Sequence, residues 1–195
     1  MKLLTLSVLT LLFIGFSSYY SHAAVMTYND RSTYLAASSS LGTTQTIDFS
    51  AKDDGTPITN PASDVYIDPL TLRGVTFNGA NSYYDGHIYT FPNAVITANL
   101  PANSRAFGTD LFRFYGLLGT FTVTLSSGES FSFASSPVNG DFFGAISDTP
   151  IQWAKFTFNN DYFVLDNFTY TNDVQAPTPT PSPMPTSPVA PSTSR

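Results

Sequence analysis

The chain contains no cysteine. A protein without thiols forms no disulfide, binds no metal through thiolates and carries out no thiolate catalysis. Histidine is almost as scarce, because there are two in 195 residues and one of them, His22, lies close to the N-terminus. His87 is therefore the one histidine of the remaining chain that could serve acid–base or metal chemistry.

Charged residues are also few, at 11% of the chain, and the only glutamate is Glu129. The formal net charge is −6, and no cluster of lysine and arginine forms a basic patch. An acidic surface of this kind argues against nucleic acid and against anionic membranes as partners. Enzymatic motifs are missing too: no nucleophile elbow, phosphate-binding loop or histidine-rich metal motif is present.

The first residues form an export signal. Lys2 supplies the positive charge, Leu3 to Phe16 are mostly apolar, and Ser21-His22-Ala23 places small residues at a cleavage site. We expect cleavage after Ala23, with Ala24 as the second choice. An uncleaved anchor is the alternative, but the apolar run is shorter than the ~20 residues that span a bilayer. We therefore expect a secreted or envelope-associated protein with no membrane span in its mature chain.

Three segments follow from composition: a signal peptide over 1–23, one domain over 24–175, and a tail over 176–195. The tail consists mainly of Pro, Thr and Ser without hydrophobic periodicity, which is typical of an extended disordered spacer. The domain is long enough to bury a core without cross-links. Its lack of cysteine suits a bacterial exported protein better than a small eukaryotic secreted one.

The pattern of the domain predicts an all-β fold. Aromatic and β-branched residues are plentiful, and they suit a pleated, half-buried surface. Asp30 can cap one short helix over 31–38. Phe121, Val123 and Leu125 alternate with threonines before a hairpin turn at 126–129. Short strands are expected over 44–49, 72–77, 94–98, 106–114, 120–125, 130–134, 142–146, 151–158 and 162–170. Many short strands at this spacing predict an antiparallel β-sandwich, most simply a jelly roll.

Asp166 is the most informative carboxylate, because it stands among large apolar residues in the last predicted strand. An ionised carboxylate there must be paired, hydrogen-bonded or bound to a metal. Calcium binds six to eight oxygens, so we group Asp48, Asp53, Asp54 and Asp166 as a candidate structural calcium site. The alternative is that Asp53 and Asp54 form a solvated turn while Asp166 accepts backbone N–H bonds.

Aromatic side chains are the candidate ligand contacts. Tyr83, Tyr84, His87 and Tyr89 lie in an irregular polar stretch, and Trp153 faces outward if Ala154 faces the core. Rings pack on the apolar faces of sugars while amides and carboxylates bind the hydroxyls. The alternative is that these rings fill the ends of the sandwich.

A catalytic role is not expected. A Ser–His–Asp triad could be assembled from His87, Asp85 and a serine, but a single histidine in a Tyr-rich loop is more often a packing or surface residue. Glycoside hydrolysis needs two opposed carboxylates, and no motif selects such a pair.

Several short motifs, taken in order, resemble one protein family. They are 28–35 (YNDRSTYL), 47–49 (IDF), 72–77 (LRGVTF), 106–110 (AFGTD), 142–147 (FFGAIS), 149–151 (TPI) and 165–170 (LDNFTY). This series resembles the ectodomain of PEP-CTERM sorting-signal proteins, a group of bacterial exported proteins. The Pro-Glu-Pro motif, transmembrane helix and basic cluster of that family are missing from this C-terminus. The resemblance implies export and a link to extracellular polysaccharide or biofilm matrix.

A looser likeness is to jelly-roll carbohydrate-binding modules, in which an acidic residue near the first strand and an Asp in the last strand hold a structural calcium. Asp48 and Asp166 match those positions. We therefore predict a non-catalytic exported protein that binds or structures extracellular polysaccharide. The alternatives are a purely structural or adhesive envelope protein, and a polysaccharide-active enzyme that uses Asp carboxylates.

Overall fold

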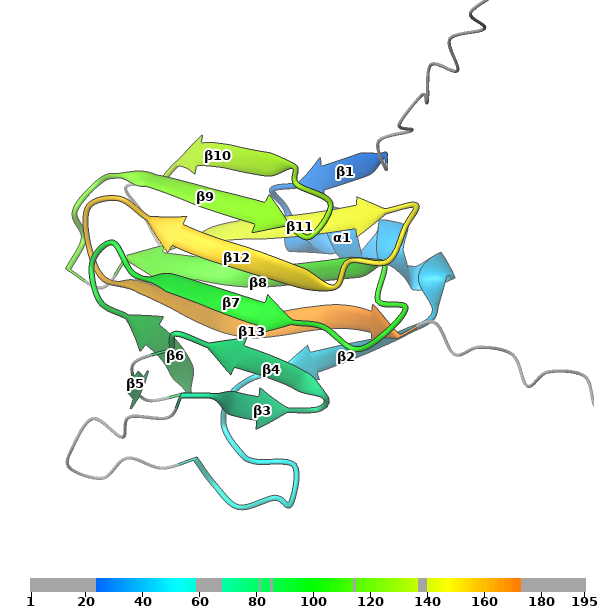
Figure 1. The fold of residues 1–195 in the computed structure, drawn as a ribbon, viewed down its shortest axis with the longest axis horizontal. Helices are drawn as coiled ribbons and strands as arrows, with labels where there is room; N and C mark the ends of the chain where they lie inside the picture. Colours follow the sequence, from blue (N-terminus) through cyan, green and yellow to red (C-terminus); the bar gives the residue numbers. More distant parts are fainter. Residues whose placement is uncertain are drawn as a thin grey trace, which may run out of the picture.

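The computed structural model describes residues 24–58, 68–80, 82–84, 86–113, 115–136 and 140–172. The predicted signal peptide over 1–23 and the predicted tail over 176–195 lie outside these residues. The described chain forms two antiparallel sheets packed face to face, with one short α-helix behind one of them (Figure 1). The predicted β-sandwich is confirmed. No helix within the described ranges has the length and apolar character needed to cross a membrane.

One sheet, here called sheet A, has seven strands in the order β1-β11-β8-β13-β6-β5, with β2 paired to the far part of β13. Its strands are β1 (Val25–Tyr28), β2 (Thr43–Ile47), β5 (Ser82–Tyr84), β6 (His87–Thr90), β8 (Ala106–Arg113), β11 (Asp141–Ser147) and β13 (Phe163–Asn172).

The second sheet, sheet C, has six strands in the order β10-β9-β12-β7-β4-β3. Its strands are β3 (Leu70–Leu72), β4 (Val75–Asn78), β7 (Val95–Asn99), β9 (Thr120–Leu125), β10 (Ser130–Ala134) and β12 (Trp153–Phe158).

The last eight strands form the predicted jelly roll. In sheet A they lie in the order β6-β13-β8-β11, and in sheet C in the order β7-β12-β9-β10. The chain passes from one sheet to the other at almost every connection, which winds two Greek keys around a single core. β9 and β10 form the one hairpin among these strands, at the turn predicted over 126–129.

The helix α1 (Arg31–Ser38) has the predicted bounds, followed by a 3₁₀ turn over Ser39–Leu41. The Asp30 side chain accepts the Thr33 N–H at 2.9 Å, which satisfies one of the free donors of the first turn. Tyr34 is fully buried against the outer face of sheet A, where Gly108 and Gly144 leave room for its ring. The helix therefore covers one end of this face.

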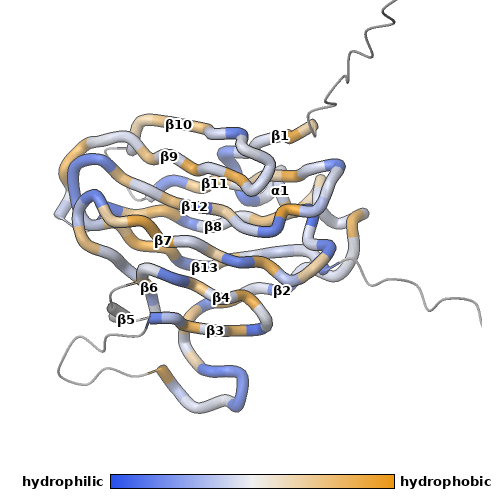
Figure 2. Tube along the Cα trace, in the orientation of Figure 1, coloured by the Kyte–Doolittle hydropathy of each residue, from blue (hydrophilic) through white to orange (hydrophobic). Residues whose placement is uncertain are grey.

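The core lies between the sheets and is rich in phenylalanine. Apolar residues alternate along the strands, as Figure 2 shows, and Phe121, Val123 and Leu125 all point inward as predicted. Phe107 lies at its centre, in ring contact with Phe143, Phe156 and Phe168. Burial of these rings is the main stabilising term of a domain without disulfides.

Two predictions of local structure are wrong. Residues 72–77 are not one strand, because Arg73 (φ 49°) and Gly74 (φ 79°) form a tight turn between β3 and β4. The stretch over 81–91 is not irregular, because β5 and β6 pair there as a second short hairpin. The sequence prediction also missed β1, which extends sheet A beside β11.

Candidate functional site

The aromatic residues predicted to bind ligand do not share one surface. Tyr83 and Tyr84 belong to β5, and their side chains lie outside the described part of the structure. His87 and Tyr89 point to the outer face of sheet A, where Tyr89 is 9% exposed. Trp153 belongs to β12 in sheet C, so it lies on the opposite face of the sandwich from His87 and Tyr89.

Trp153 does point outward, as the alternation along its strand predicted. Its neighbour Ala154 is buried, Lys155 is exposed, and the Lys155 ammonium lies 4.6 Å from the centre of the Trp153 ring. A cation over the face of an indole is a favourable contact. The ring is therefore accessible in part and already has one partner.

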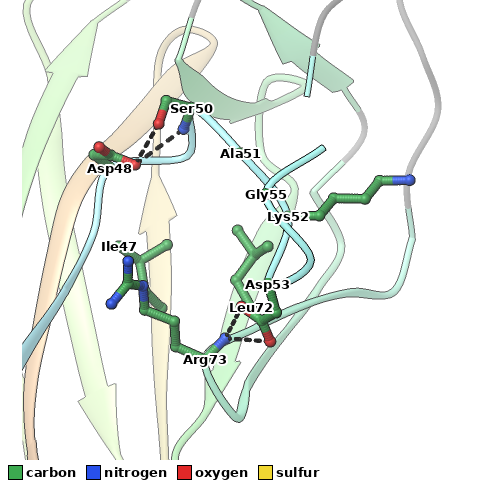
Figure 3. Close-up of a pocket in the computed structure, with 9 residues that line it drawn as sticks. All are labelled: Ile47, Asp48, Ser50, Ala51, Lys52, Asp53, Gly55, Leu72 and Arg73. Atoms are coloured by element: carbon green, nitrogen blue, oxygen red, sulfur yellow. Dashed lines mark hydrogen bonds between the residues drawn. The ribbon is translucent and has the colours of Figure 1, made fainter. Parts of the chain in front are cut away.

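Two of the predicted calcium ligands, Asp48 and Asp53, line a pocket of about 470 Å³ beside the loop that follows β2 (Figure 3). Asp48 accepts the Ser50 N–H at 3.1 Å, and this bond holds the pKa of Asp48 below its usual value. Both oxygens of Asp53 accept the Arg73 N–H, at 2.8 and 2.9 Å. Each carboxylate thus stabilises a turn, and Figure 3 shows that the two do not converge.

The other two predicted ligands lie outside that pocket. Asp54 accepts the Thr56 N–H at 2.9 Å in a turn, as the alternative for this stretch expected. Asp166 lies in the middle of β13. Among the described residues, no group of three or more Asp, Glu, His or Cys side chains could hold a metal ion. Calcium stays a prediction, which thermal unfolding with calcium and with a chelator would test.

Asp166 belongs to a charged row that crosses sheet A. The row consists of Arg31 from α1, Asp110 from β8, Asp166 from β13 and His87 from β6. Arg31 Nη2 lies 3.0 Å from Asp110 Oδ1, and His87 Nδ1 lies 3.3 Å from Asp166 Oδ2. Asn167 joins the two carboxylates, because its Nδ2 donates to Asp110 Oδ2 and to Asp166 Oδ2, both at 3.0 Å.

A break in the strand places Asn167 between these carboxylates. The pairing of β13 with β8 shifts between Asp166 and Thr169, and Asn167 has a φ of 47°. Asparagine tolerates this left-handed conformation better than most residues. Its carbonyl accepts Arg31 Nη2 at 2.9 Å, so the bulge also anchors the start of α1.

Burial raises the pKa of Asp166, and the negative charge of Asp110 raises it further. The Asn167 N–H bond and the nearby His87 act in the opposite direction. His87 keeps 39% of its side chain exposed, against 14% for Asp166. The carboxylate expected from sequence to need a partner therefore has several, and it is more buried than the His87 side chain beside it.

A second cluster lies at the loop end of the same three strands, and we call it the aromatic end. It consists of Phe91 after β6, Tyr115 after β8 and Tyr162 before β13. The Tyr162 ring lies 5.6 Å from Phe91 and 5.4 Å from Tyr115, both in edge-to-face contact. Phe91 is nevertheless 51% exposed and Tyr115 68% exposed. Leu117 and Leu118, also exposed by more than half, extend this apolar surface.

The aromatic end rests on a buried carboxylate. Asp161 is 2% exposed. Its Oδ2 accepts the N–H groups of Tyr115 at 3.0 Å and of Leu117 at 3.4 Å, and its Oδ1 accepts the Tyr162 N–H at 2.7 Å. One side chain thus holds the β8–β9 and β12–β13 loops together, so the rings stand on a fixed support.

Sequence reasoning missed the aromatic end, because its three rings are far apart along the chain. The signal that could have found it is the run 160–162, in which an Asp stands between an Asn and a Tyr just before the last strand. A polar residue at the start of a central strand is a position where a side chain can bind loop backbone.

Comparison with known proteins gives structural likeness alone. No family model matches the chain, and no curated protein matches it. Among solved structures, a family 29 carbohydrate-binding module aligns at a TM-score of 0.37 and 16% identity, covering 66% of this chain and 87% of that chain. A variant of CBM29-2 complexed with mannohexaose aligns at a TM-score of 0.38 and 17% identity, covering 66% and 90%.

Proposed function

We propose that this protein is an exported, non-catalytic module that binds extracellular polysaccharide, and that the aromatic end is its main contact surface. The observation that supports the proposal is the exposure of Phe91 and Tyr115 around Tyr162, on a cluster in which buried Asp161 fixes the loops of Tyr115 and Tyr162. Exposed rings are costly to hydrate unless a partner covers them, and the flat apolar faces of sugar rings are suitable partners.

The charged row would supply the polar contacts. Three of its four side chains come from β6, β8 and β13, the strands whose loops carry the aromatic end. Asp110, Asp166 and His87 are partly exposed, and their oxygens and nitrogens can exchange hydrogen bonds with hydroxyl groups. A polymer lying along these strands would contact the rings of the aromatic end at one position and the side chains of the charged row farther along.

The resemblance to PEP-CTERM ectodomains bears on where the protein acts. It favours an exopolysaccharide or biofilm matrix as the ligand, encountered at or outside the cell envelope. A purely structural matrix protein without a ligand site is the competing interpretation, and it leaves the exposure of the aromatic end without a reason.

A polysaccharide-active enzyme is the second candidate, because one amide holds Asp110 and Asp166 side by side. Glycosidases place one carboxyl on each side of the scissile bond. Here both carboxylates converge on Asn167, and Arg31 neutralises Asp110. The arrangement therefore suits hydrogen bonding better than acid catalysis. Release of reducing sugar from a bound polysaccharide, abolished by Asp166→Asn, would favour the enzyme.

The test is retardation of the protein in gels that contain soluble polysaccharides, after a glycan array has selected them. Phe91→Ala and Tyr115→Ala should each weaken binding at least about tenfold, as expected when a central aromatic contact is lost. Trp153→Ala on the opposite sheet is the matched control and should bind normally. Loss of binding in the control alone would move the site to sheet C, and no binding to any polysaccharide would favour the structural alternative.

A further inference from the structure

One free edge of sheet C is formed by β10, which has the sequence Ser-Phe-Ser-Phe-Ala over 130–134. On one side it pairs with β9, and Figure 1 shows it at the rim of the sandwich, with β1 at the corresponding rim of sheet A. A groove of about 820 Å³ opens between these two rims, lined by Phe131, Phe133 and Phe142 among others. Nothing in the described chain therefore pairs with the outer edge of β10.

The direction of the unpaired backbone groups follows from the hairpin. Leu125 N–H donates to the Glu129 carbonyl, and Ser135 N–H donates to the Gly119 carbonyl. Hydrogen-bonded and non-hydrogen-bonded pairs alternate in an antiparallel ladder, so the odd-numbered residues of β10 bond to β9. The N–H and C=O groups of Ser130, Ser132 and Ala134 consequently point outward.

This edge lacks the features by which free strands avoid pairing. Between 130 and 134 there is no charged residue, no proline and no bulge. β3 and β5 have three residues each, and β1 lies against α1. β2 is as long as β10, but its exposed and partly buried residues are Thr and Gln rather than phenylalanine. β10 is thus the edge among the described strands that combines length with apolar side chains.

The segment is also complementary to itself. If two copies pair antiparallel about Ser132, all three outward-pointing residues find partners: Ser132 faces Ser132, and Ser130 faces Ala134. Phe131 then faces Phe133 across a non-hydrogen-bonded pair, where aromatic side chains lie closest. Both rings are only partly buried in the single chain, although each contacts Phe143, at 5.9 and 5.8 Å. Their remaining apolar surface would be covered in such a pair.

We propose that β10 is a self-association surface, through which two copies of this chain join their sheets C edge to edge about a two-fold axis at Ser132. The pair is isologous, so it closes as a dimer and does not extend into a fibre. Uncharged small residues at the axis matter in a chain of net charge −6, because like charges there would oppose contact. The proposal does not depend on polysaccharide binding.

The first test is sedimentation velocity of the full-length protein over a range of concentrations. Wild type should show a concentration-dependent dimer. Ser132→Pro removes an outward N–H that takes no part in the β9 ladder, and it also loses the exposed Ser132–Thr122 hydroxyl contact, so its thermal midpoint should match that of a variant that loses the hydroxyl alone. Its dimer should dissociate about tenfold more readily or worse, since two symmetric hydrogen bonds are lost. Ser132→Ala, which keeps the N–H, is the control.

The second test uses the absence of cysteine. Ser132→Cys places one thiol from each copy in a hydrogen-bonded pair with Cα atoms about 5.5 Å apart, within the range that a disulfide spans. Ser130→Cys faces Ala134 of the other copy, so its own thiols stay apart. On oxidation, Ser132→Cys should cross-link readily and Ser130→Cys should not. A monomeric wild type, a Ser132→Pro dimer as tight as wild type, or equal cross-linking of the two variants would each overturn the proposal.

Discussion

At the scale of single residues, the protein places its carboxylates where backbone donors need acceptors. Asp30, Asp48 and Asp54 each accept an N–H two or three residues ahead. Asp161 does the same for loops that are distant in sequence. With 14 acidic side chains and 8 basic ones, few carboxylates can find a cation, and backbone N–H groups take that place.

Asp161 gives the sharpest prediction for a single side chain. Asp161→Ala leaves the Tyr115 and Leu117 N–H groups without this acceptor in a partly buried position, which should cost about 1–3 kcal/mol of the free energy of unfolding. The loops would also lose their support, so polysaccharide binding should weaken together with stability. Chemical denaturation measures the first effect and gel retardation the second. Asp54→Ala, at an exposed turn, should change neither appreciably.

Asp166 gives a prediction for pH. Burial raises its pKa, so the native state binds the proton more tightly than the unfolded chain does. Stability from this group is therefore present at low pH and is lost as pH rises from its usual value of 3.8 through the raised value. Asp166→Asn should gain stability relative to wild type as pH rises across this window, measured by thermal unfolding.

The charged groups that face Asp166 are Asp110, His87 and, through Asp110, Arg31. Repeating the comparison in a His87→Gln background removes the contribution of the His87 contact. If Asp166→Asn lost stability relative to wild type as pH rose, the ion pair with His87 would outweigh the cost of burial, and the raised pKa would be wrong.

At the scale of elements, the helix α1 depends on the sheet beneath it. Tyr34 lies over two glycines of neighbouring strands, Gly108 and Gly144, which pair directly with each other. A β-carbon at Gly144 would lie 2.6 Å from Tyr34 Cδ2. Close contact between helix and sheet thus requires the absence of side chains at these two positions.

We expect Gly144→Ala to destabilise the protein by about 1–3 kcal/mol, as overpacking of a tight contact does. The cause can be tested with a double-mutant cycle, because Tyr34→Leu should relieve part of the clash. The free energies of unfolding of the two single variants and of the double variant provide the coupling. Simple additivity would mean that Tyr34 is not the side chain that limits this position.

The elements also show how far sequence reasoning reaches. The helix was predictable to the residue because Asp30 and the turn it caps are adjacent, and β9 and β10 were predictable because their alternation is strict. The turn at Arg73–Gly74 was missed because an arginine with positive φ interrupts an otherwise regular strand pattern. β4 also pairs with β7, and this tertiary pairing outweighs the local pattern that predicted one continuous strand.

The candidate site was less predictable than the fold. That Asp166 needs partners followed from its apolar neighbours, but their identity depended on a bulge that brings Asn167 between two strands. The aromatic end joins residues 91, 115 and 162, which only the complete jelly roll brings together. Contacts between residues so far apart in the sequence produce no periodic pattern that a single sequence could show.

At the scale of the whole molecule, the two proposals place their surfaces on different parts of the sandwich. The aromatic end lies at the loop end of β6, β8 and β13 in sheet A, whereas the association surface is the β10 edge of sheet C. A dimer through β10 would not use the aromatic end of either copy. Each dimer would then carry two polysaccharide sites held at a fixed separation.

Two fixed sites predict a difference between long and short ligands. A polymer that reaches both sites converts the second contact into an intramolecular one, and avidity gains of about 10²-fold or more arise in this way without new contacts. Ser132→Pro should therefore bind an insoluble or high-molecular-weight polysaccharide at least about tenfold more weakly than wild type. It should bind a short oligosaccharide of the same sugar equally well. Pull-down on the polymer and calorimetry with the oligosaccharide measure the two affinities. Equal loss on both ligands would place β10 within the sugar site itself, and no loss on either would mean that the two copies act independently.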